Sequence, residues 1–137
     1  TVKRKIMTNK TWNILFWVLQ ILLGGLFLMA GLFKTITPIS EMAADMPWVA
    51  EVSPLLVKVP AVAEILGGLG LILPSALRIQ PKLTIYAAYG LLAVMVLAAI
   101  FHMTRGEYEA IGTNFLFGGL AYTIAWGRTN KAPITAR

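Results

Sequence analysis

Four polar or ionisable side chains stand within or at the ends of apolar stretches of the sequence: Lys34, Glu64, His102 and Asn114. Such side chains are costly in hydrocarbon and are functional candidates by default. A lysine–glutamate pair with a histidine beside it can neutralise charge, move a proton or orient a polar head group. We therefore expect these four residues to form a ligand-binding or proton-handling site.

Each of these residues also has a purely structural interpretation. Lys34 can extend its ammonium group from a helix end to the membrane surface, and Glu64 can serve only as an ion-pair partner of Lys34 or Lys58. His102 can be a solvated helix cap, and Asn114 can hold two helices together through its amide. The four residues are expected on four different helices but at one depth, in the outer third of the membrane, and this coincidence favours a site.

Other kinds of centre are disfavoured by the residue content. The chain has one histidine and no cysteine, which argues against a multi-ligand metal or haem centre. The string EILGGLGLILP does not predict a phosphate-binding loop, because its glycines lie inside an apolar run without a preceding strand. We expect no metal, and a quinone is the one cofactor that the analysis leaves open.

The elements that must position these residues are membrane-spanning helices. Only 13% of the 137 residues are charged, against about a quarter in soluble domains. Apolar runs cover residues 12–33, 59–77, 83–103 and 110–126, and each is about long enough to cross a bilayer as a helix. The sequence predicts one all-α domain over residues 1–137, a four-helix transmembrane bundle with a short interfacial segment between the first two helices.

The first apolar run is expected to remain part of the protein rather than to be a cleaved signal peptide. The basic residues Lys3, Arg4 and Lys5 precede it, as in a signal sequence. Its 22 residues exceed a signal core, however, and no cleavage site follows. Whether residues 1–6 are native is left open, and Met7 is an alternative start.

The distribution of charge predicts the orientation in the membrane. One side holds the N-terminus, the 75–82 link and the C-terminal tail, and the other holds the 34–58 and 104–109 loops. Nine basic residues and no acid fall on the first side, namely Lys3, Arg4, Lys5, Lys10, Arg78, Lys82, Arg128, Lys131 and Arg137. All six acids fall toward the second side. By the positive-inside rule we expect both termini in the cytoplasm of a bacterial-type inner membrane. We expect no nucleic-acid partner, because the basic residues do not form one clustered face.

Small residues share helix faces with the four polar residues. Gly31 lies one turn before Lys34, Gly67 and Gly68 follow Glu64, and Gly118 and Ala121 follow Asn114. Small residues mark close helix–helix contact in membranes, so we expect each polar side chain to point into the bundle. Arg105 and Glu109, with Glu107 and Tyr108 between them, are expected at the mouth of the site, or as a solvated turn.

The sequence resembles the DoxX-like family of small four-helix membrane proteins from about residue 12 to residue 128. The segments LFLMAGLFK, EILGGLGLILP, FHMTRGE and NFLFGGLAYTIAWGR carry the resemblance. The resemblance implies a link to membrane redox chemistry, since the family is named for a subunit associated with a quinone-reducing sulfur oxidoreductase. Many members have no assigned role.

Three functions follow as expectations. The first is a membrane subunit or binder that handles a quinone or similar lipophilic molecule near the outer leaflet. The second is a structural anchor for a membrane-protein partner, or a homo-oligomer built through glycine faces. The third, and weakest, is a proton-coupled transporter, since the biased charge predicts a single orientation. Whether the protein catalyses a reaction is left open.

Overall fold

The protein is built almost entirely from helices. A computed structural model describes the backbone of residues 2–137 and the side chains of residues 9–137. The predicted charges of Lys3, Arg4 and Lys5 and the alternative start at Met7 lie outside the described side chains. The chain is 81% helical, and no strand occurs in the described residues. The helices are α1 (Val2–Ile36), α2 (Ile39–Met42), the 3-10 helix η1 (Pro47–Ala50), α3 (Pro54–Leu77), α4 (Lys82–Thr104) and α5 (Glu109–Asn130).

The prediction of an all-α membrane protein is confirmed, but the count of four spans is confirmed only in part. Three helices are long and apolar enough to cross a membrane: α1 from Asn9 to Ile36, α3 and α4. The structure has four long helices and the short α2. Helix α5 has 22 residues, but it does not reach the apolar character of the other three because it includes Asn114, Arg128 and several threonines and glycines.

All four long helices extend beyond the predicted spans, and the earlier start of α3 changes the position of Glu64 within its helix. Helix α3 begins at Pro54, where Ser53 caps it by accepting a hydrogen bond from the Leu55 amide. Pro60, one residue after the start of the predicted span, lies inside the helix. Glu64 is therefore roughly three turns into α3, rather than one. The predicted span begins at residue 59, too late by five residues, because hydropathy marks only the apolar run and the capping residue Ser53 lies before that run.

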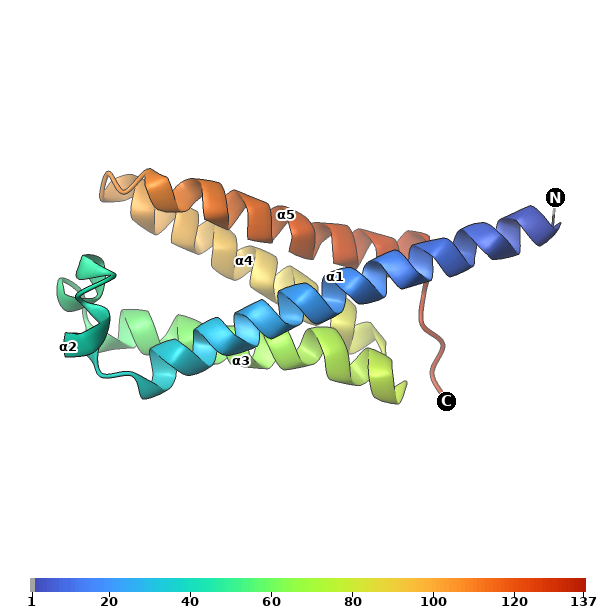
Figure 1. Ribbon diagram of the computed structural model, residues 1–137, viewed down its shortest axis with the longest axis horizontal. Helices are drawn as coiled ribbons and strands as arrows, with labels where there is room; N and C mark the ends of the chain where they lie inside the picture. The colour runs from blue at the N-terminus through green and yellow to red at the C-terminus, as the bar shows by residue number, and fades with distance from the viewer. Residues whose placement is uncertain (1) are drawn as a thin grey trace.

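The four long helices form two pairs that diverge toward one end (Figure 1). Helix α1 packs along α3 and α4 along α5, while α3 and α4 join the pairs and α1 touches α5 less. The link between α3 and α4 is tight, as expected, and turns through left-handed backbone at Arg78 and Gln80 (φ 55° and 50°). Both chain termini lie at one end of the bundle, and α2 lies at the other.

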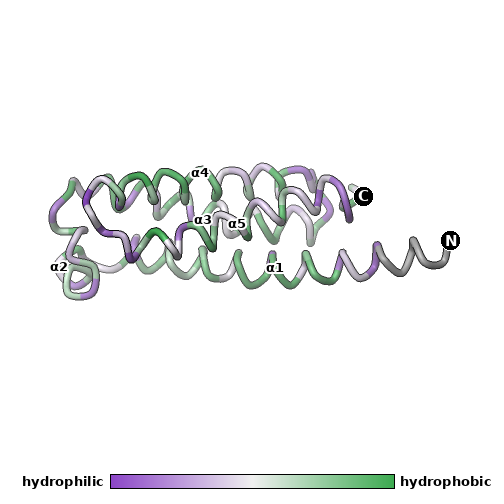
Figure 2. Tube along the Cα trace, turned by 90° about the horizontal axis from the view of Figure 1, so that it is seen from above, coloured by the Kyte–Doolittle hydropathy of each residue, from purple (hydrophilic) through white to green (hydrophobic). Residues whose placement is uncertain are grey.

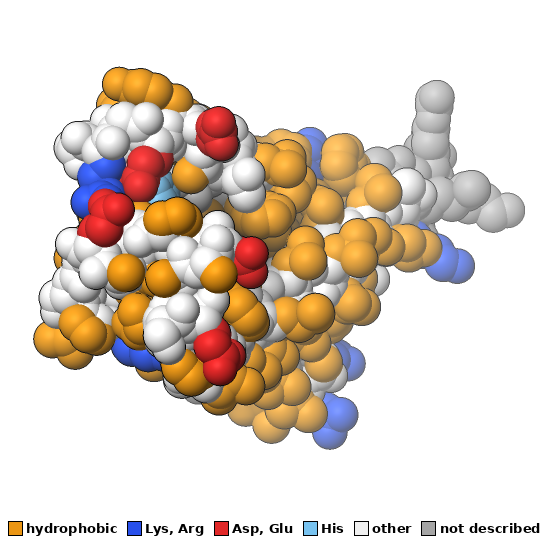
Figure 3. Space-filling view, turned by 60° about the vertical axis from the view of Figure 1, so that its left-hand side comes forward, with side chains coloured by type: hydrophobic (Ala, Val, Ile, Leu, Met, Phe, Trp, Pro, Cys, Tyr) orange, Lys and Arg blue, Asp and Glu red, His pale blue; other side chains and the backbone are white. Residues whose placement is uncertain are grey.

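The core lies between the pairs, and the outside is apolar as well. Leu23, Phe27, Leu71, Leu91 and Ile124 are buried in one cluster. Hydrophobic residues predominate along the middle of the long helices, and hydrophilic residues lie mostly at their ends (Figure 2). In the space-filling view the acidic side chains lie at the α2 end, with apolar side chains over the flanks (Figure 3). This distribution suits helices surrounded by lipid.

The α1–α3 contact depends on glycines. A β-carbon at Gly31 would lie 2.6 Å from the Ala61 carbonyl oxygen, and one at Gly68 would lie 2.6 Å from the Gly24 carbonyl oxygen. Both obstacles are backbone atoms, which cannot move aside as a flexible side chain can. The two helix backbones therefore approach closely, as small residues allow in membranes, and this fixes the position of Lys34 relative to Glu64.

Candidate functional site

A cavity of about 1110 Å³ lies between the two helix pairs at the α2 end. Its walls are largely apolar and come from α1, α3, α4 and α5, and the segment around η1 and the α4–α5 link contribute to its rim. Apolar lining residues include Leu26, Phe27, Ala30, Val94, Met95, Ala98, Phe101 and Phe117, and polar ones include Lys34, Glu64, His102, Glu107, Glu109, Thr113 and Asn114. All four polar residues singled out from the sequence thus line one cavity.

Lys34 and Glu64 form an ion pair at this cavity. The Lys34 ammonium donates to Glu64 Oε1 at 2.7 Å, and the Glu64 side chain is 5% exposed. Lys58, the other partner considered for Glu64, instead donates to the carbonyl oxygens of Lys34, Thr35 and Thr37. Lys58 therefore caps the C-terminal end of α1, where unpaired carbonyls and the helix dipole favour a cation.

Two buried polar atoms in the cavity lack a hydrogen-bond partner among the described residues. They are Glu64 Oε2, the oxygen that Lys34 does not use, and Asn114 Nδ2. Buried polar atoms are rarely left unpaired, because each costs about 1–3 kcal/mol. One is an acceptor and the other a donor, so together they match a polar group that offers both functions.

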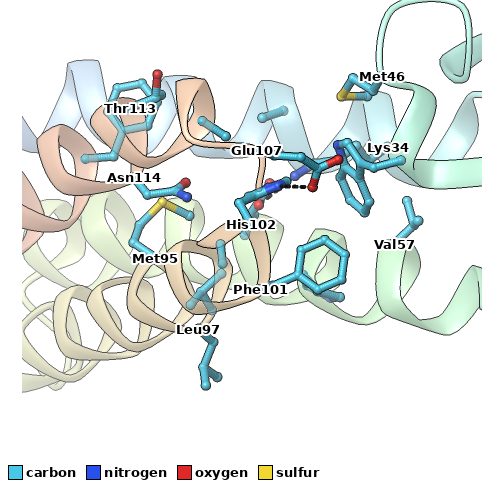
Figure 4. Close-up of a pocket in the computed structure, with 18 of the residues that line it drawn as sticks. Lys34, Met46, Val57, Met95, Leu97, Phe101, His102, Glu107, Thr113 and Asn114 are labelled. Atoms are coloured by element: carbon cyan, nitrogen blue, oxygen red, sulfur yellow. Dashed lines mark hydrogen bonds and ion pairs between the residues drawn. The ribbon is translucent and has the colours of Figure 1, made fainter. Parts of the chain in front are cut away.

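His102 lies in the same cavity but pairs with a different carboxylate. Its Nδ1 donates to Glu107 Oε1 at 2.9 Å. Figure 4 shows His102, Asn114 and Lys34 directed toward the same space, with Glu107 next to His102. His102 thus lines the same cavity as the Lys34–Glu64 pair, but its direct hydrogen bond goes to Glu107 in the α4–α5 link.

A chain of polar contacts continues from His102 across the rim. Arg105 Nε donates to Glu107 Oε1 at 3.1 Å, and Arg105 Nη2 donates to Glu51. The hydrogen bond from His102 lowers the pKa of Glu107 below its ordinary 4.5, against partial desolvation, and the hydrogen bond from Arg105 lowers it further. This chain ties the α4–α5 link to the segment before α3.

The mouth residues separate into two roles. Glu109 lines the cavity, as do Glu107 and Tyr108, whereas Arg105 is not among the lining residues. Arg105 instead lies behind the rim and packs over the Phe101 ring at 5.5 Å. Trp48 from η1 also stacks edge-on against Phe101 and His102, with ring centroids 5.5 Å apart in each case.

The predicted packing residues lie at helix contacts. Besides Gly31 and Gly68, Gly67 faces the Leu91 side chain and Gly118 faces Met95, while Ala121 is fully buried. None of the predicted packing residues lines the cavity, so they hold the helices together rather than offer atoms to a ligand.

Sequence analysis missed a second polar centre near the chain termini. Arg128 Nε donates to Gln20 Oε1 at 2.6 Å, and Arg128 Nη1 donates to Asn13 Oδ1 at 2.7 Å. Gln20 Nε2 donates in turn to the Leu71 carbonyl oxygen at 2.7 Å. Asn13 and Gln20, seven residues apart on one helix face, were the available signal, but a search for charges in apolar runs passes over amides.

The chemistry open to the site is binding and proton handling by side chains. Among the described residues, no group of three His, Cys, Asp or Glu side chains lies close enough to hold a metal ion.

A family model described as the DoxX-like family matches residues 18–124. No curated protein and no solved structure matches the sequence. The family match covers most of the 137 residues, including all of α3 and α4, the second half of α1 and most of α5, and the chain belongs to the DoxX-like family.

Proposed function

We propose that this small membrane protein binds a quinone or a similar lipophilic molecule in the cavity beside Glu64 and Asn114. The observation that carries the proposal is the pair of buried, unpartnered polar atoms, Glu64 Oε2 and Asn114 Nδ2, at an apolar cavity of about 1110 Å³. Pockets for small molecules combine apolar walls with a few placed polar groups in this way.

The polar atoms restrict what the head group must offer. Paired with Lys34, Glu64 accepts hydrogen bonds at Oε2, whereas Asn114 Nδ2 only donates. A ring carrying one hydroxyl and one carbonyl or second hydroxyl oxygen satisfies both, as a quinol does. A quinone offers acceptors only, so it satisfies Asn114 but not the Glu64 carboxylate. The apolar walls would hold the ring and the first part of a tail.

The same proposal includes a placement in the membrane. We propose that helix α5 is the fourth span, and its position alongside α4, running back to the end that holds both termini, supports this (Figure 1). The excess of basic residues at that end supports an orientation with both termini in the cytoplasm of a bacterial-type inner membrane. The cavity then opens toward the outer leaflet, at the depth where a lipophilic ligand with a polar head would enter.

The test is a binding titration with the full chain in lipid nanodiscs. A short-tailed benzoquinol and its quinone are added, and quenching of tryptophan fluorescence is measured. We expect saturable binding, tighter for the quinol, and about tenfold weaker quinol binding in Asn114→Leu, as for one lost hydrogen bond.

The matched control is Asn130→Leu, the same substitution at the other end of α5, where the amide donates to the Trp126 carbonyl oxygen. We expect it to bind quinol like the unsubstituted protein. Unsaturable quenching, or equal quinol affinity in Asn114→Leu and Asn130→Leu, would exclude this site and leave a structural role for the polar layer.

A further inference from the structure

The half of the bundle that holds the chain termini carries positive charge without negative charge. The acids all lie in the α2–η1 region, in the outer half of α3 or near the α4–α5 link: Glu41, Asp45, Glu51, Glu64, Glu107 and Glu109. Within the termini half lies Arg128, which is only 2% exposed. A buried guanidinium group is therefore present where the chain offers no acidic side chain.

The partners of Arg128 accept hydrogen bonds from its guanidinium but do not neutralise it. They are the side-chain oxygens of Gln20 and Asn13 and the Ala132 carbonyl oxygen. The guanidinium also packs against Phe16 and Trp17, 5.8 Å and 5.6 Å from their ring centroids. Buried charges in proteins are generally paired, because an uncompensated one is costly to desolvate.

Arg128 is one of the residues that line a hollow of about 180 Å³. Lys82 from the start of α4 lines it together with Arg128, Ser75 and Thr129, and the tail residues Pro133 and Ile134 form another wall. The tail is held by Arg78, which donates from Nε to the Thr135 carbonyl oxygen at 2.7 Å and accepts from the Arg137 amide at 3.0 Å. The hollow is thus formed by chain segments that are fixed to one another.

Lys82 supplies a second charge that the protein does not use elsewhere. No hydrogen bond or ion pair of the described side chains involves its ammonium group, which lies on an exposed residue. Arg128 and Lys82 line one small hollow, and a guanidinium and an ammonium group are the two kinds of donor that bind phosphate oxygens.

We propose that this hollow binds a phosphate group between Lys82 and Arg128, supplied by an anionic phospholipid of the leaflet at the termini end. Trp12 and Trp126 lie edge to face at this end, with Lys131 over both rings. Tryptophans and lysines of this kind mark the depth of the lipid head groups. Basic pockets between helices at this depth bind anionic head groups, and each lysine near the surface contributes to that attraction.

The test uses the purified full chain, freed of lipid in detergent, with lipid binding followed by native mass spectrometry. Phosphatidylglycerol, phosphatidylcholine, diacylglycerol and inorganic phosphate are compared. We expect phosphatidylglycerol to bind most tightly and Lys82→Ala to weaken it about fivefold. The matched control Lys10→Ala removes the same charge from an exposed residue of α1 that does not line the hollow, and it should leave binding almost unchanged.

Each other outcome decides the proposal. If Lys82→Ala and Lys10→Ala lost the same affinity for phosphatidylglycerol, or if both variants bound phosphatidylglycerol and phosphatidylcholine equally, the lipid would be attracted by diffuse surface charge and not by the hollow. Displacement of the lipid by millimolar inorganic phosphate would support phosphate recognition and assign the hollow to a free anion. Binding of neither would overturn the proposal. Lys82→Glu, which leaves the Arg128 contacts intact, should abolish the preference for phosphatidylglycerol.

Discussion

The two ends of the bundle carry opposite kinds of incompleteness. At the α2 end the charge is balanced, since Lys34 pairs with Glu64, but Glu64 Oε2 and Asn114 Nδ2 lack hydrogen-bond partners. At the termini end Arg128 and Gln20 are held by hydrogen bonds, but no acidic side chain balances the guanidinium. The first end calls for a neutral group that donates and accepts, and the second calls for an anion.

This difference separates a site from a structural lock. Unpaired polar atoms beside a large cavity lower the stability of the ligand-free protein, so they are explained by a ligand that pairs them. Paired polar atoms that join α1, α3, α5 and the tail stabilise the fold itself, whatever binds nearby. Substitutions at the two ends should therefore change the stability of the ligand-free protein in opposite directions.

The largest effect is expected from Arg128→Met. This change leaves the Gln20 and Asn13 side-chain oxygens and the Ala132 carbonyl oxygen without their donor. Since each buried group left unpaired costs about 1–3 kcal/mol, we expect a loss of about 3 kcal/mol in the free energy of unfolding. Reversible unfolding in mixed detergent micelles measures it.

Lys131→Met is the matched control for this change, because it removes the same charge three residues away. Lys131 lies over the rings of Trp12 and Trp126 at 5.9 Å and 5.6 Å, and an exposed cation–π contact contributes about 0.5–1 kcal/mol. If both variants lost the same stability, the network around Arg128 would not be the lock described above.

A smaller effect of opposite sign is expected from Asn114→Leu. The substitution removes the unpaired Nδ2 donor and puts an apolar side chain against an apolar wall, so the ligand-free protein should gain about 1 kcal/mol. The same unfolding measurement applies, with Asn130→Leu as the control that should lose a little stability. A loss of stability in Asn114→Leu would mean that its amide holds helices together, as the structural interpretation has it.

The fold and the layer of polar residues were largely predictable because both follow from periodic, local signals. Long apolar runs predict spanning helices, and Lys34, Glu64, His102 and Asn114 were visible as exceptions within or beside them. Small residues at helical spacing predicted the close contacts of Gly31 and Gly68. The start of α3 was missed because a cap at Ser53 depends on one hydroxyl outside the apolar run.

Pairings between distant residues were not predictable in the same way. The preference of His102 for Glu107 depends on how the α4–α5 link turns at Gly106, which has φ 73°. The Gln20–Arg128 contact joins residues 108 positions apart, and neither residue breaks the hydropathy pattern in a way that points to the other. The sequence pattern places side chains on faces, and only the crossing of the helices decides which faces meet.

The smallest effect concerns the pH dependence of the hydrogen bonds that His102 and Arg105 donate to Glu107 at the rim of the α2 end, which we call the clasp. His102 and Arg105 hold Glu107 in its charged form, so its pKa in the folded protein lies below the ordinary 4.5. The stability that Glu107 contributes is therefore complete above about pH 4.5 and is lost as pH falls through the lowered pKa.

Glu107→Gln keeps an acceptor for His102 and removes the titration. We expect the stability advantage of the unsubstituted protein over Glu107→Gln to be constant between pH 5 and 7 and to shrink below about pH 4.5. A difference that stays constant down to pH 3 would show that the carboxylate charge contributes nothing, and the clasp would then be an ordinary neutral hydrogen bond. The contribution of the Arg128 network at the termini end, where no acidic side chain lies, should not change with pH over this range.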